Sequence, residues 1–437
     1  MISNIISRGI NGSRSIPGDK SISHRSIIIP AISNGICEVK NILKSEDVLH
    51  TLEAFKNMGV KIIEDENNVT IIGNGLNSLK KPKNEIYLGN SGTSARLLTG
   101  LLASQKFDSI LKGDKSLSKR PMDRIADPLT KMRAKIHTND GKLPLKIIPS
   151  NLVPTKIDLK IPSAQIKSGL ILASLNIKGE TELIENKITR DHTEIMLKSF
   201  GADIKINKLD NKKHIKIIGG KELKSKNIDV PNDLSSSAFF IITALINQGS
   251  HILIKNINNN PTRNGLIIAL KKMGANILFH NKRLSNNEEI CDIEVFSSNL
   301  NGCELGPEIA DLMIDEYPIL SIAASFAQSP SVFRGLKELR VKESDRLNLI
   351  LINLQNCGVD CKIINDDLFI NPSKKYNVKN NIIRTDFDHR IAMAFSVMGT
   401  KLGPLEIRDS ESINTSFPTF KGEFNRLGGK IFWRILS

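Results

Sequence analysis

Helix endings of one kind recur along this chain at intervals of 68 to 84 residues. At each ending an apolar helical run stops at a hydrophobic residue, and a short segment with strand-like character follows. The residues that separate the helical run from the strand-like segment in the six copies are Gly59, Arg133, Gly201, Gly274, Gly358 and Gly428. Glycine suits the position after a helix, because that residue often takes a left-handed backbone that a Cβ disfavours. Arg133 departs from the pattern, so we expect its helix to end differently.

This period restricts the architecture more than any other feature. A repeat of about 70 residues is longer than the units of common solenoids, so we expect six small α/β units. A chain of 437 residues exceeds one compact core, which favours two similar domains of three units each. Segment 233–248 supports buried helices, since it begins with Asp and three serines, is apolar on nearly every face and stops at Gly249.

The formal net charge of +15 would suit a nucleic-acid-binding protein. Aromatic residues make up only 5%, however, and the basic residues form no arm or tail and no zinc-finger or RNP-type motif. These features argue against nucleic-acid binding as the main role.

Five cysteines without a C-x-x-C pair favour a reduced, cytoplasmic protein with buried thiols and no structural metal. We expect no signal peptide and no membrane span, because the longest apolar stretch, 238–246, is too short.

Five stretches place Lys or Arg in a turn rich in Gly, Ser or Asp, just before an apolar helical run. They are residues 18–25, 89–96, 119–124, 340–346 and 386–390. A helix start has unpaired N–H groups and a partial positive charge, so a cation there lowers helix stability. That loss is understandable where helix starts bind anions. The sequence therefore predicts a protein that holds small, densely charged, phosphorylated molecules.

Nucleotide-binding motifs do not explain these stretches. Asp19 stands where a phosphate-binding loop needs glycine before its lysine, and no G-x-G-x-x-G follows a predicted strand. Acidic segments could instead supply catalysis. Asp315 lies in the apolar segment 311–318, where burial and nearby cations can tune a general base; a helix cap or surface acid is the alternative. Residues 342–346 could equally be a solvated helix start, and 190–194 a capping box.

Seven ordered motifs resemble the EPSP synthase family of 3-phosphoshikimate 1-carboxyvinyltransferases. They are GDKSISHR, GNSGTSAR, KRPMDR, PSAQIKSG, TRDHTE, RVKESDR and DHRIAMAF, with IDEYP among them. The resemblance covers nearly the whole chain. It implies an α/β fold of two similar domains, each of three βαβαββ units in an inverse α/β barrel-like arrangement, closing over a central cleft. The implied boundaries are 1–16 plus 230–437 for a discontinuous first domain, 17–229 for the second, and hinges near 15–17 and 229–231.

The resemblance implies transfer of the enolpyruvyl group of phosphoenolpyruvate to the 5-hydroxyl of shikimate 3-phosphate, with release of phosphate, in chorismate and aromatic amino acid biosynthesis. The two substrates carry roughly five to six negative charges, which fixed cations must offset. By motif match, shikimate 3-phosphate should contact Lys20, Ser21, Arg25, Ser163, Ala164, Gln165, Arg190, Asp315 and Lys342. Phosphoenolpyruvate should contact Lys20, Gly92, Arg120, Gln165, Arg346 and Arg390.

Three residues are the implied catalytic groups. Asp315 should deprotonate the attacking hydroxyl, Glu343 should protonate the methylene carbon, and Lys20 should reach both substrates. Lys342 should touch substrate and tune Glu343, and Arg96 lies in a motif without a firm role. The resemblance implies no cofactor, no metal, no nucleic acid and no membrane partner, and we expect a cytoplasmic monomer.

The chain departs from one large subgroup of the family. Thr415 precedes Ser-Phe-Pro where many members have Lys before Thr-Phe-Pro, so one phosphate-binding cation is missing. Together with Ser-Ala-Gln at 163–165 and TRDHTE, this resembles the other large subgroup, whose members often tolerate glyphosate through Ala at the Gly92 position. Because Gly92 is retained here, we expect sensitivity, since a Cβ would crowd the longer inhibitor more than the substrate.

Two other functions compete with this interpretation. The sister enzyme that transfers enolpyruvyl to UDP-N-acetylglucosamine shares the fold and usually has a reactive Cys in a mobile loop. This chain has no cysteine between Cys37 and Cys291, and two motifs fit the shikimate enzyme better. A basic nucleic-acid-associated protein could also keep the fold. The presence of Asp315, Glu343 and Lys20 together argues against it, because binding by charge alone needs no paired acids.

Overall fold

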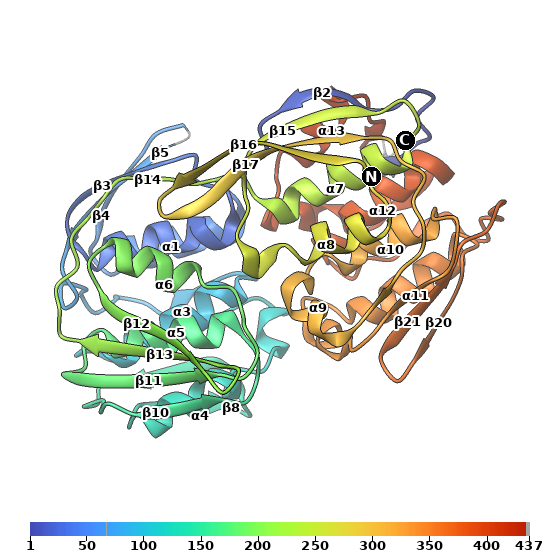
Figure 1. Ribbon diagram of the computed structural model, residues 1–437. Helices are drawn as coiled ribbons and strands as arrows, with labels where there is room; N and C mark the ends of the chain where they lie inside the picture. The colour runs from blue at the N-terminus through green and yellow to red at the C-terminus, as the bar shows by residue number, and fades with distance from the viewer. Residues whose placement is uncertain (67, 434–437) are drawn as a thin grey trace. The chain divides into compact units, whose positions relative to one another are not determined.

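The computed structural model describes residues 1–66 and 68–433, and the chain divides into two compact units (Figure 1). Unit 1 comprises Met1–Pro17, Asn232–Leu284 and Glu289–Ser437, and unit 2 comprises Gly18–Pro231 and Ser285–Glu288. In the described part of each unit there are three four-stranded sheets. The hinge segments expected from the sequence remain predictions.

All six sheets of the described chain share one pattern of strand order. In each, the two strands at one end of the order run parallel, and the second of them pairs antiparallel with the third. A helix joins parallel strands within a unit, as for β10, α5 and β11. This pattern confirms the predicted α/β fold of six repeated units.

The sheets of unit 2 are, in spatial order, β14(Ile228–Asp229)-β3(Asn34–Lys40)-β5(Asn68–Asn74)-β4(Lys61–Glu64), β6(Ile86–Tyr87)-β7(Ser109–Lys112)-β9(Lys142–Ile148)-β8(Lys135–Asn139) and β10(Lys156–Leu159)-β11(Gly179–Glu185)-β13(Lys212–Gly219)-β12(Asp203–Leu209). Its helices are α1(Lys20–Ala31), α2(Glu46–Asn57), α3(Gly92–Ala103), η1(Leu117–Lys119), α4(Asp123–Lys131), α5(Ala164–Ser174) and α6(His192–Ser199).

The sheets of unit 1 are β16(Ile277–Ser285)-β17(Glu288–Phe296)-β15(His251–Asn258)-β2(Asn11–Arg14), β18(Glu304–Leu305)-β19(Ser331–Phe333)-β21(Asp367–Asn371)-β20(Asp360–Ile364) and β22(Ile382–Ile383)-β23(Leu405–Ile407)-β1(Ile2–Ser3)-β24(Ile431–Phe432). Its helices are α7(Leu234–Ile246), η2(Pro261–Arg263), α8(Gly265–Lys272), α9(Pro307–Met313), α10(Tyr317–Ser325), η3(Lys337–Val341), α11(Arg346–Asn356), α12(His389–Leu402), η4(Ser410–Thr415) and α13(Phe420–Arg426).

Strand pairing departs from chain order at the two crossings between the units. β2 precedes α1 in sequence but pairs with β15 of unit 1, whereas β14 precedes α7 but pairs with β3 of unit 2. The N-terminal strand β1 completes the last sheet by pairing with β23 and β24. Each crossing therefore leaves the first strand of a repeat in one unit and its helix in the other.

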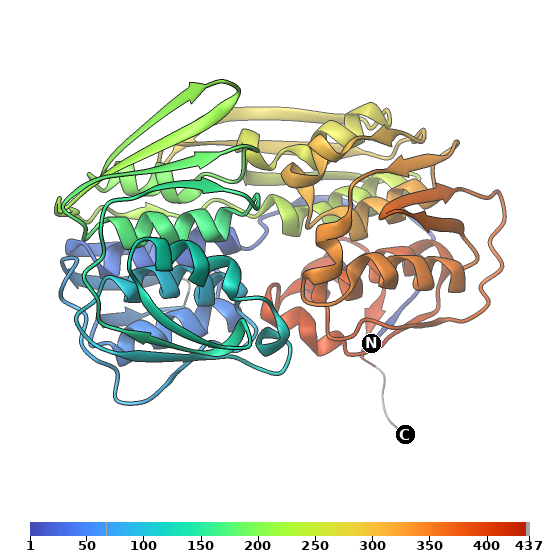
Figure 2. The same ribbon diagram turned by 90° about the horizontal axis from the view of Figure 1, so that it is seen from below.

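The helices that follow the parallel strands form the interior of each unit, with the sheets outside them (Figures 1 and 2). In unit 2, α3 and α5 approach closely through glycines, because a Cβ on Gly100 would lie 1.9 Å from the carbonyl oxygen of Gly169. In unit 1, α7 is buried from Leu234 to Leu245 and is capped by Asp233, as its composition predicted. The helix ends at Ile246, slightly before the expected stop at Gly249.

The six repeated helix endings all have a left-handed residue, including Arg133 with φ of 69°. The prediction that this helix would end differently is therefore wrong. The N–H groups of Arg133 and Ala134 bond to the carbonyls of Thr130 and Leu129 at 2.9 and 3.1 Å, the same pattern that closes the helix at Gly59. These bonds fix the backbone whatever the side chain, and they offset a strain of about 1–3 kcal/mol for a non-glycine residue.

All five cysteines are free and buried. In residues 1–66 and 68–433, no helix has both the length and the apolar character that crossing a membrane requires.

Candidate anion-binding and acid–base sites

Helices begin at all five cation-bearing stretches of the sequence. They are α1, α3 and α4 in unit 2, and α11 and α12 in unit 1. At four of the five, a side chain accepts a hydrogen bond from a backbone N–H of the first turn; the capping residues are Asp19, Ser91, Asp345 and Asp388. A helix start has four such N–H groups, so capped starts of this kind still suit an anion.

The residues predicted to bind substrates fall into two groups. Unit 2 contains Lys20, Ser21, Arg25, Gly92, Arg120, Ser163, Ala164, Gln165 and Arg190. Unit 1 contains Asp315, Lys342, Glu343, Arg346 and Arg390. Each group gathers residues that are far apart in the sequence, and each has its own chemistry.

Arg25 of α1 is 4% exposed, yet it is bound by neutral groups. Its guanidinium donates hydrogen bonds to Oγ1 of Thr193 at 2.7 Å, to Oγ of Ser168 at 2.8 Å and to the carbonyl of Ser21 at 2.8 Å. The two hydroxyl oxygens lie 2.6 Å apart. None of these three partners is charged, although the carboxylates of Glu194, Asp19 and Glu288 partly offset the charge of Arg25 through space. Because its hydrogen bonds go to neutral groups, the guanidinium can take an added anion without losing an ion pair.

Arg190 lies just before α6, and its charge is close enough to lower the pKa of Arg25. Burial is the larger cause and brings the pKa of Arg25 to about 10, although Glu194 opposes the shift. Arg25 is therefore still protonated at neutral pH. Two cations held near one another, one of them buried, are typical of a site for a multiply charged anion.

The starts of α1 and α5 present other predicted ligands. Lys20 is the first residue of α1 and forms an ion pair with Asp47 at the start of α2. Ser163 caps α5 by accepting a hydrogen bond of 3.4 Å from the N–H of Ile166. Ala164 is the first residue of α5, so its backbone N–H is in the first turn, where anions bind.

The start of α3 is connected to α5 through Gln165. Arg96 donates to Oε1 of Gln165 at 2.8 Å, and Nε2 of Gln165 donates to Oγ1 of Thr93 at 3.0 Å. A Cβ on Gly92 would lie 2.9 Å from Nη1 of Arg96 and 3.0 Å from Nη1 of Arg120. Glycine therefore lets both guanidinium groups approach the start of α3, and Arg96 gains a role that the sequence did not assign.

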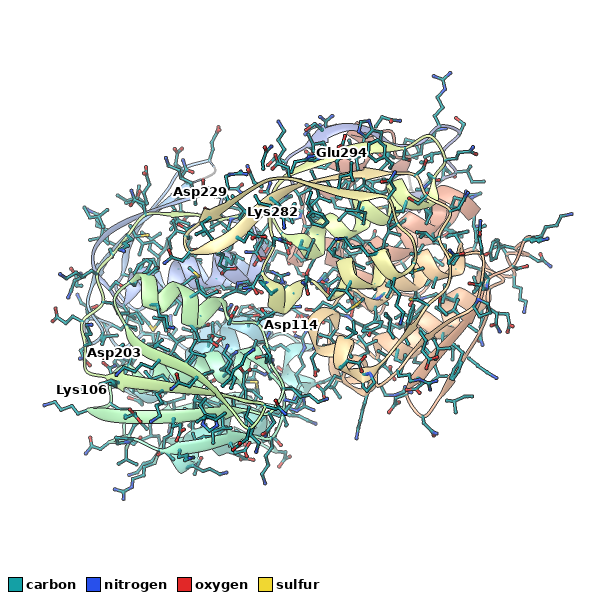
Figure 3. All side chains as sticks on the ribbon, in the orientation of Figure 1. Lys106, Asp114, Asp203, Asp229, Lys282 and Glu294 are labelled. Atoms are coloured by element: carbon teal, nitrogen blue, oxygen red, sulfur yellow. The ribbon has the colours of Figure 1, made fainter. Side chains whose placement is uncertain are left out.

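Arg120 is held by a chain of polar groups. Its guanidinium donates to Oδ1 of Asn90, and the amide of Asn90 donates to Asp114 at 2.8 Å (Asp114 is labelled in Figure 3). Asp114 also accepts from the N–H of Leu117 at 2.7 Å, which fixes it at the start of η1. The arrangement orients Arg120 beside the start of α3.

Lys167 and Glu194 form a buried ion pair of 2.9 Å within a larger network. Lys167 also contacts Glu185 at 3.0 Å, and Lys213 contacts Glu194 at 3.3 Å. The capping-box interpretation of TRDHTE is therefore wrong, since Glu194 pairs with lysines and Asp191 makes no side-chain capping hydrogen bond. Lys167 and Glu194 adjoin in sequence the two hydroxyl residues that hold the buried arginine of α1.

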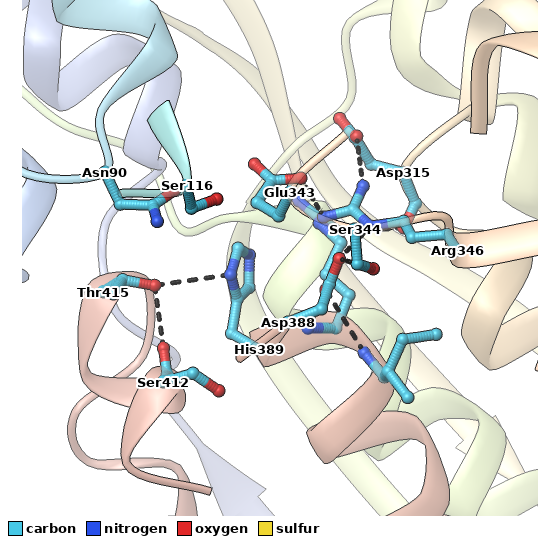
Figure 4. Close-up of polar contacts among 12 residues, drawn as sticks. Asn90, Ser116, Asp315, Glu343, Ser344, Arg346, Asp388, His389, Ser412 and Thr415 are labelled. Carbon is cyan, nitrogen blue, oxygen red and sulfur yellow. Dashed lines mark hydrogen bonds and ion pairs between the residues drawn. The ribbon is translucent and has the colours of Figure 1, made fainter. Parts of the chain in front are cut away.

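In unit 1, Arg346 is 1% exposed and contacts three carboxylates (Figure 4). Nη1 lies 3.2 Å from Asp315, Nη2 lies 2.5 Å from Glu343, and Nε lies 2.8 Å from Asp388. Burial lowers the pKa of Arg346, but the three carboxylates together raise it well above its ordinary value. The two predicted acid–base residues thus share one guanidinium.

Asp388 organises the start of α12 around this cluster. It accepts hydrogen bonds from the Arg390 N–H at 2.9 Å and from Oγ of Ser344 at 3.0 Å. The Arg390 guanidinium donates to the carbonyl of Asp315 at 3.1 Å. Near the same start, Nδ1 of His389 lies 3.3 Å from Oγ1 of Thr415, the residue at the position of the missing lysine (Figure 4).

Sequence reasoning missed several residues that hold these groups. Thr193 and Asp388 lie inside quoted motifs, and their polar side chains were the available signal. Glu288 lies in no motif. It is on the tip of the β16–β17 hairpin, in the four residues that belong to unit 2, and it contacts Nδ1 of buried His192 at 2.7 and 3.0 Å. No local pattern could have predicted this pair.

Within the described residues, no group of three His, Cys, Asp or Glu side chains is arranged to hold a metal ion.

Comparison with known proteins identifies the family. The family model of EPSP synthase (3-phosphoshikimate 1-carboxyvinyltransferase) matches residues 6–424. Proteins named 3-phosphoshikimate 1-carboxyvinyltransferase include that of Ruthia magnifica subsp. Calyptogena magnifica, which is 46% identical over 97% of this chain and 96% of its own length. That of Hydrogenovibrio crunogenus is 43% identical over 96% of this chain and 95% of its own.

Solved structures agree with this comparison. An EPSP synthase from Acinetobacter baumannii matches with a TM-score of 0.86 and 44% identity, covering 98% of both chains. The enolpyruvyl transferase NikO from Streptomyces tendae has a TM-score of 0.76 at 15% identity, over 98% of this chain and 97% of that one, which shows a shared fold alone. The family match, the relatives and the solved structures lead to one conclusion: the chain belongs to the EPSP synthase family.

Proposed function

We propose that this protein transfers the enolpyruvyl group of phosphoenolpyruvate to the 5-hydroxyl of shikimate 3-phosphate and releases phosphate. The observation that carries the proposal is a buried arginine, Arg25, that hydrogen-bonds neutral oxygens while Arg190 adds a second positive charge nearby. Such a site is suited to an added anion. The names of the relatives supply the reaction to which this chemistry is suited.

Unit 2 supplies the cations for the phosphates. The phosphate of shikimate 3-phosphate binds to Arg25, to Arg190 and to the start of α5 at Ser163 and Ala164. The phosphate of phosphoenolpyruvate binds to Arg120 and to the start of α3 at Gly92. Lys20, Ser21 and Gln165 complete these contacts, and Lys20 and Gln165 serve both substrates. Charge-assisted hydrogen bonds of this kind are roughly twice as strong as neutral ones.

Unit 1 supplies the acid and the base. Arg346 binds the carboxylate of phosphoenolpyruvate as a planar fork, with Arg390 beside it. In the structure its two Nη atoms contact Asp315 and Glu343. The incoming carboxylate therefore replaces these two side chains, while Asp388 keeps Nε in place. This exchange releases the base and the acid only when phosphoenolpyruvate is bound.

The chemistry then follows an addition–elimination sequence. Asp315 takes the proton of the 5-hydroxyl as its oxygen bonds to C2 of phosphoenolpyruvate, and Glu343, assisted by Lys342, gives a proton to the methylene carbon. Glu343 then takes a proton back from the resulting methyl group, the double bond re-forms as the C–O bond to phosphate breaks, and the proton on Asp315 passes to the departing phosphate. Atoms and charges balance without any cofactor.

Release of phosphate from phosphoenolpyruvate tests the proposal. The assay is run with shikimate 3-phosphate and, in parallel, with UDP-N-acetylglucosamine. We expect release only with shikimate 3-phosphate. Release only with the sugar nucleotide would assign the chain to the sister reaction, and release with neither would contradict an enolpyruvyl transferase.

The setting of the enzyme is part of the proposal. Five free, buried thiols suit a reducing compartment, so we place the enzyme in the cytoplasm. We also propose that it acts as a monomer. Segments 15–17 and 229–231 act as hinges between the domains 1–16 plus 230–437 and 17–229. Substrates should protect both segments from proteolysis, and unchanged cleavage with both substrates present would contradict the hinge.

A further inference from the structure

His24 is a completely buried histidine in α1, and one of its ring nitrogens lacks a partner. Nδ1 lies 2.8 Å from Oγ1 of Thr51 and 3.3 Å from Oγ of Ser94. Nε2 is buried and has no hydrogen-bond partner among the described residues. No step of the proposed reaction uses this residue, although it lies in the same helix as Lys20 and Arg25.

The contacts of His24 continue through hydroxyl groups into a second helix. Oγ1 of Thr51 lies 2.5 Å from Oγ of Ser94, which lies 2.6 Å from Oγ of Ser91. Ser91 is the cap of α3 and accepts a hydrogen bond of 3.1 Å from the N–H of Ser94. All four side chains are buried, with exposures of 0% for His24, Thr51 and Ser94 and 1% for Ser91.

The unpartnered nitrogen decides where the proton of a neutral imidazole lies. A proton on Nε2 would be a buried donor without an acceptor, which is among the least tolerated defects in a protein interior. A proton on Nδ1 leaves only an unshared lone pair at Nε2 and gives Thr51 a donor at 2.8 Å. The Nδ1–H tautomer is therefore the stable one.

This tautomer fixes the direction of the first hydrogen bond, in which Thr51 accepts from His24. Short hydroxyl contacts then join Thr51 to Ser94 and Ser94 to Ser91, and the Thr51 hydroxyl also lies 3.3 Å from the carbonyl oxygen of Asp47. Ser91 is then held with its oxygen toward the first turn of α3, next to Gly92. The chain of bonds thus joins the helix that begins with Lys20 to the helix that begins with Gly92.

We propose that His24 is a positioning residue that donates through Nδ1–H and, by way of Thr51 and Ser94, fixes the start of α3 relative to the start of α1. The functional part of this inference rests on the proposed function, in which these two starts bind phosphoenolpyruvate and shikimate 3-phosphate.

The surroundings of His24 keep its ring neutral. Burial is the main cause that holds the pKa of His24 well below its ordinary value, and the charges of Lys20 and Arg25 add to it, against Asp19. A neutral ring has one N–H, so the choice of nitrogen matters. The alternative is that His24 only fills space in the core, in which case an apolar residue would replace it without loss in substrate binding.

The first experiment reads the tautomer by 15N NMR of protein labelled at histidine. The sequence has 8 histidines, and the signals that vanish in His24→Asn identify the ring of interest. We expect a protonated Nδ1 and an unprotonated Nε2 at neutral pH. A protonated Nε2, or a ring protonated on both nitrogens, would overturn the proposal. This result does not depend on the reaction, so it stands apart from failure of the proposed function.

The second experiment uses three substitutions that separate the hydrogen bond from packing. An Asn side chain places its amide near the Nδ1 position, a Gln amide reaches only toward Nε2, and Leu has no donor. We expect the Michaelis constant for phosphoenolpyruvate to rise about tenfold in His24→Leu and His24→Gln, as for loss of one buried hydrogen bond, and to stay within about twofold in His24→Asn. The value of kcat should change by less than about threefold in all three.

A fourth variant tests the far end of the chain of bonds. Ser94→Ala should raise the Michaelis constant for phosphoenolpyruvate by about fivefold and leave Nδ1 of His24 protonated, because Thr51 still accepts its proton. Thermal unfolding of every variant checks that it is folded. Equal behaviour of the Asn and Gln variants, or an unchanged Michaelis constant in a folded His24→Leu protein, would each overturn the positioning role.

Discussion

Two buried arginines show how differently the two units hold positive charge. Arg25 in unit 2 hydrogen-bonds two hydroxyls and a carbonyl, whereas Arg346 in unit 1 contacts three carboxylates. Accordingly, burial lowers the pKa of Arg25 to about 10, while its carboxylates raise the pKa of Arg346 despite burial. Arg25 thus hydrogen-bonds only neutral groups and interacts with Glu194, Asp19 and Glu288 through space, whereas Arg346 contacts three carboxylates directly.

The difference separates binding from chemistry. A cation whose hydrogen bonds all go to neutral groups can bind a phosphate without first breaking an ion pair, so the site of Arg25 is prepared for its ligand. A guanidinium that holds the acid and the base can bind a substrate carboxylate only by releasing them. We infer that unit 2 is specialised for affinity and unit 1 for turnover, and the following predictions test that division.

The largest effect should come from removing the base in unit 1. Asp315→Asn should lower kcat by about 10³-fold, within the range for general-base catalysis, and leave the affinity for shikimate 3-phosphate within about fivefold. Phosphate release gives the rate, and calorimetric titration gives the affinity. A near-normal rate would remove Asp315 from the base role, and a lost affinity would break the division between the units.

The same substitution at the two arginines should affect different quantities: mainly stability at Arg346 and mainly substrate binding at Arg25. Arg346→Met leaves three carboxylates close together and should reduce the free energy of unfolding by about 3–5 kcal/mol. Arg25→Met removes hydrogen bonds to neutral oxygens and only a through-space attraction to Glu194, Asp19 and Glu288, so it should reduce this free energy by less, about 1–2 kcal/mol. The Michaelis constant for shikimate 3-phosphate should rise at least about 50-fold. Urea unfolding and steady-state kinetics measure both quantities. Equal destabilisation would show that Arg25 also depends on buried carboxylates.

A smaller effect is expected at Gly92 of unit 2. The Cβ of Gly92→Ala would lie within 3.0 Å of the Arg96 and Arg120 guanidinium groups, so both must shift. We expect an increase of about tenfold in the Michaelis constant for phosphoenolpyruvate and a larger decrease in glyphosate inhibition, with kcat little changed. Inhibition assays on both proteins provide the measurement, and unchanged inhibition would refute the predicted basis of glyphosate sensitivity.

The smallest effect concerns stability in mild acid. Because the pKa of His24 is lowered on folding, mainly by burial, the unfolded chain binds more protons below pH 6.5, and stability should fall as the pH drops from there. Glu194 affects stability only at lower pH. Burial raises its pKa, but Lys167 and Lys213 together outweigh burial and hold the pKa below its ordinary value. Urea midpoints at pH 7.5 and 5.5 should differ less in His24→Asn than in the natural protein. An equal difference would assign the acid sensitivity to other groups.

Local sequence predicted the repeated units well because helix endings and strand alternation depend on neighbouring residues. It failed at Arg133, where backbone hydrogen bonds imposed the left-handed conformation on a residue that disfavours it. It also left a capping box open as the alternative for residues 190–194, which the folded chain excludes by pairing Glu194 with Lys167 and Lys213. In both cases contacts in the folded protein outweigh a local preference.

The sequence alone determined the α/β repeat, the family resemblance and the helix starts at which cations gather, because each of these features depends on residues that are close together in the chain. Only the tertiary structure decided the electrostatic state of each cation. Thr193 and Ser168 reach Arg25 from helices that are distant in the sequence, α6 and α5. Asp315 reaches Arg346 from the turn between α9 and α10, and Asp388 from the cap of α12. Charge interactions depend on distance and burial in space, and neither can be read from separation along the chain.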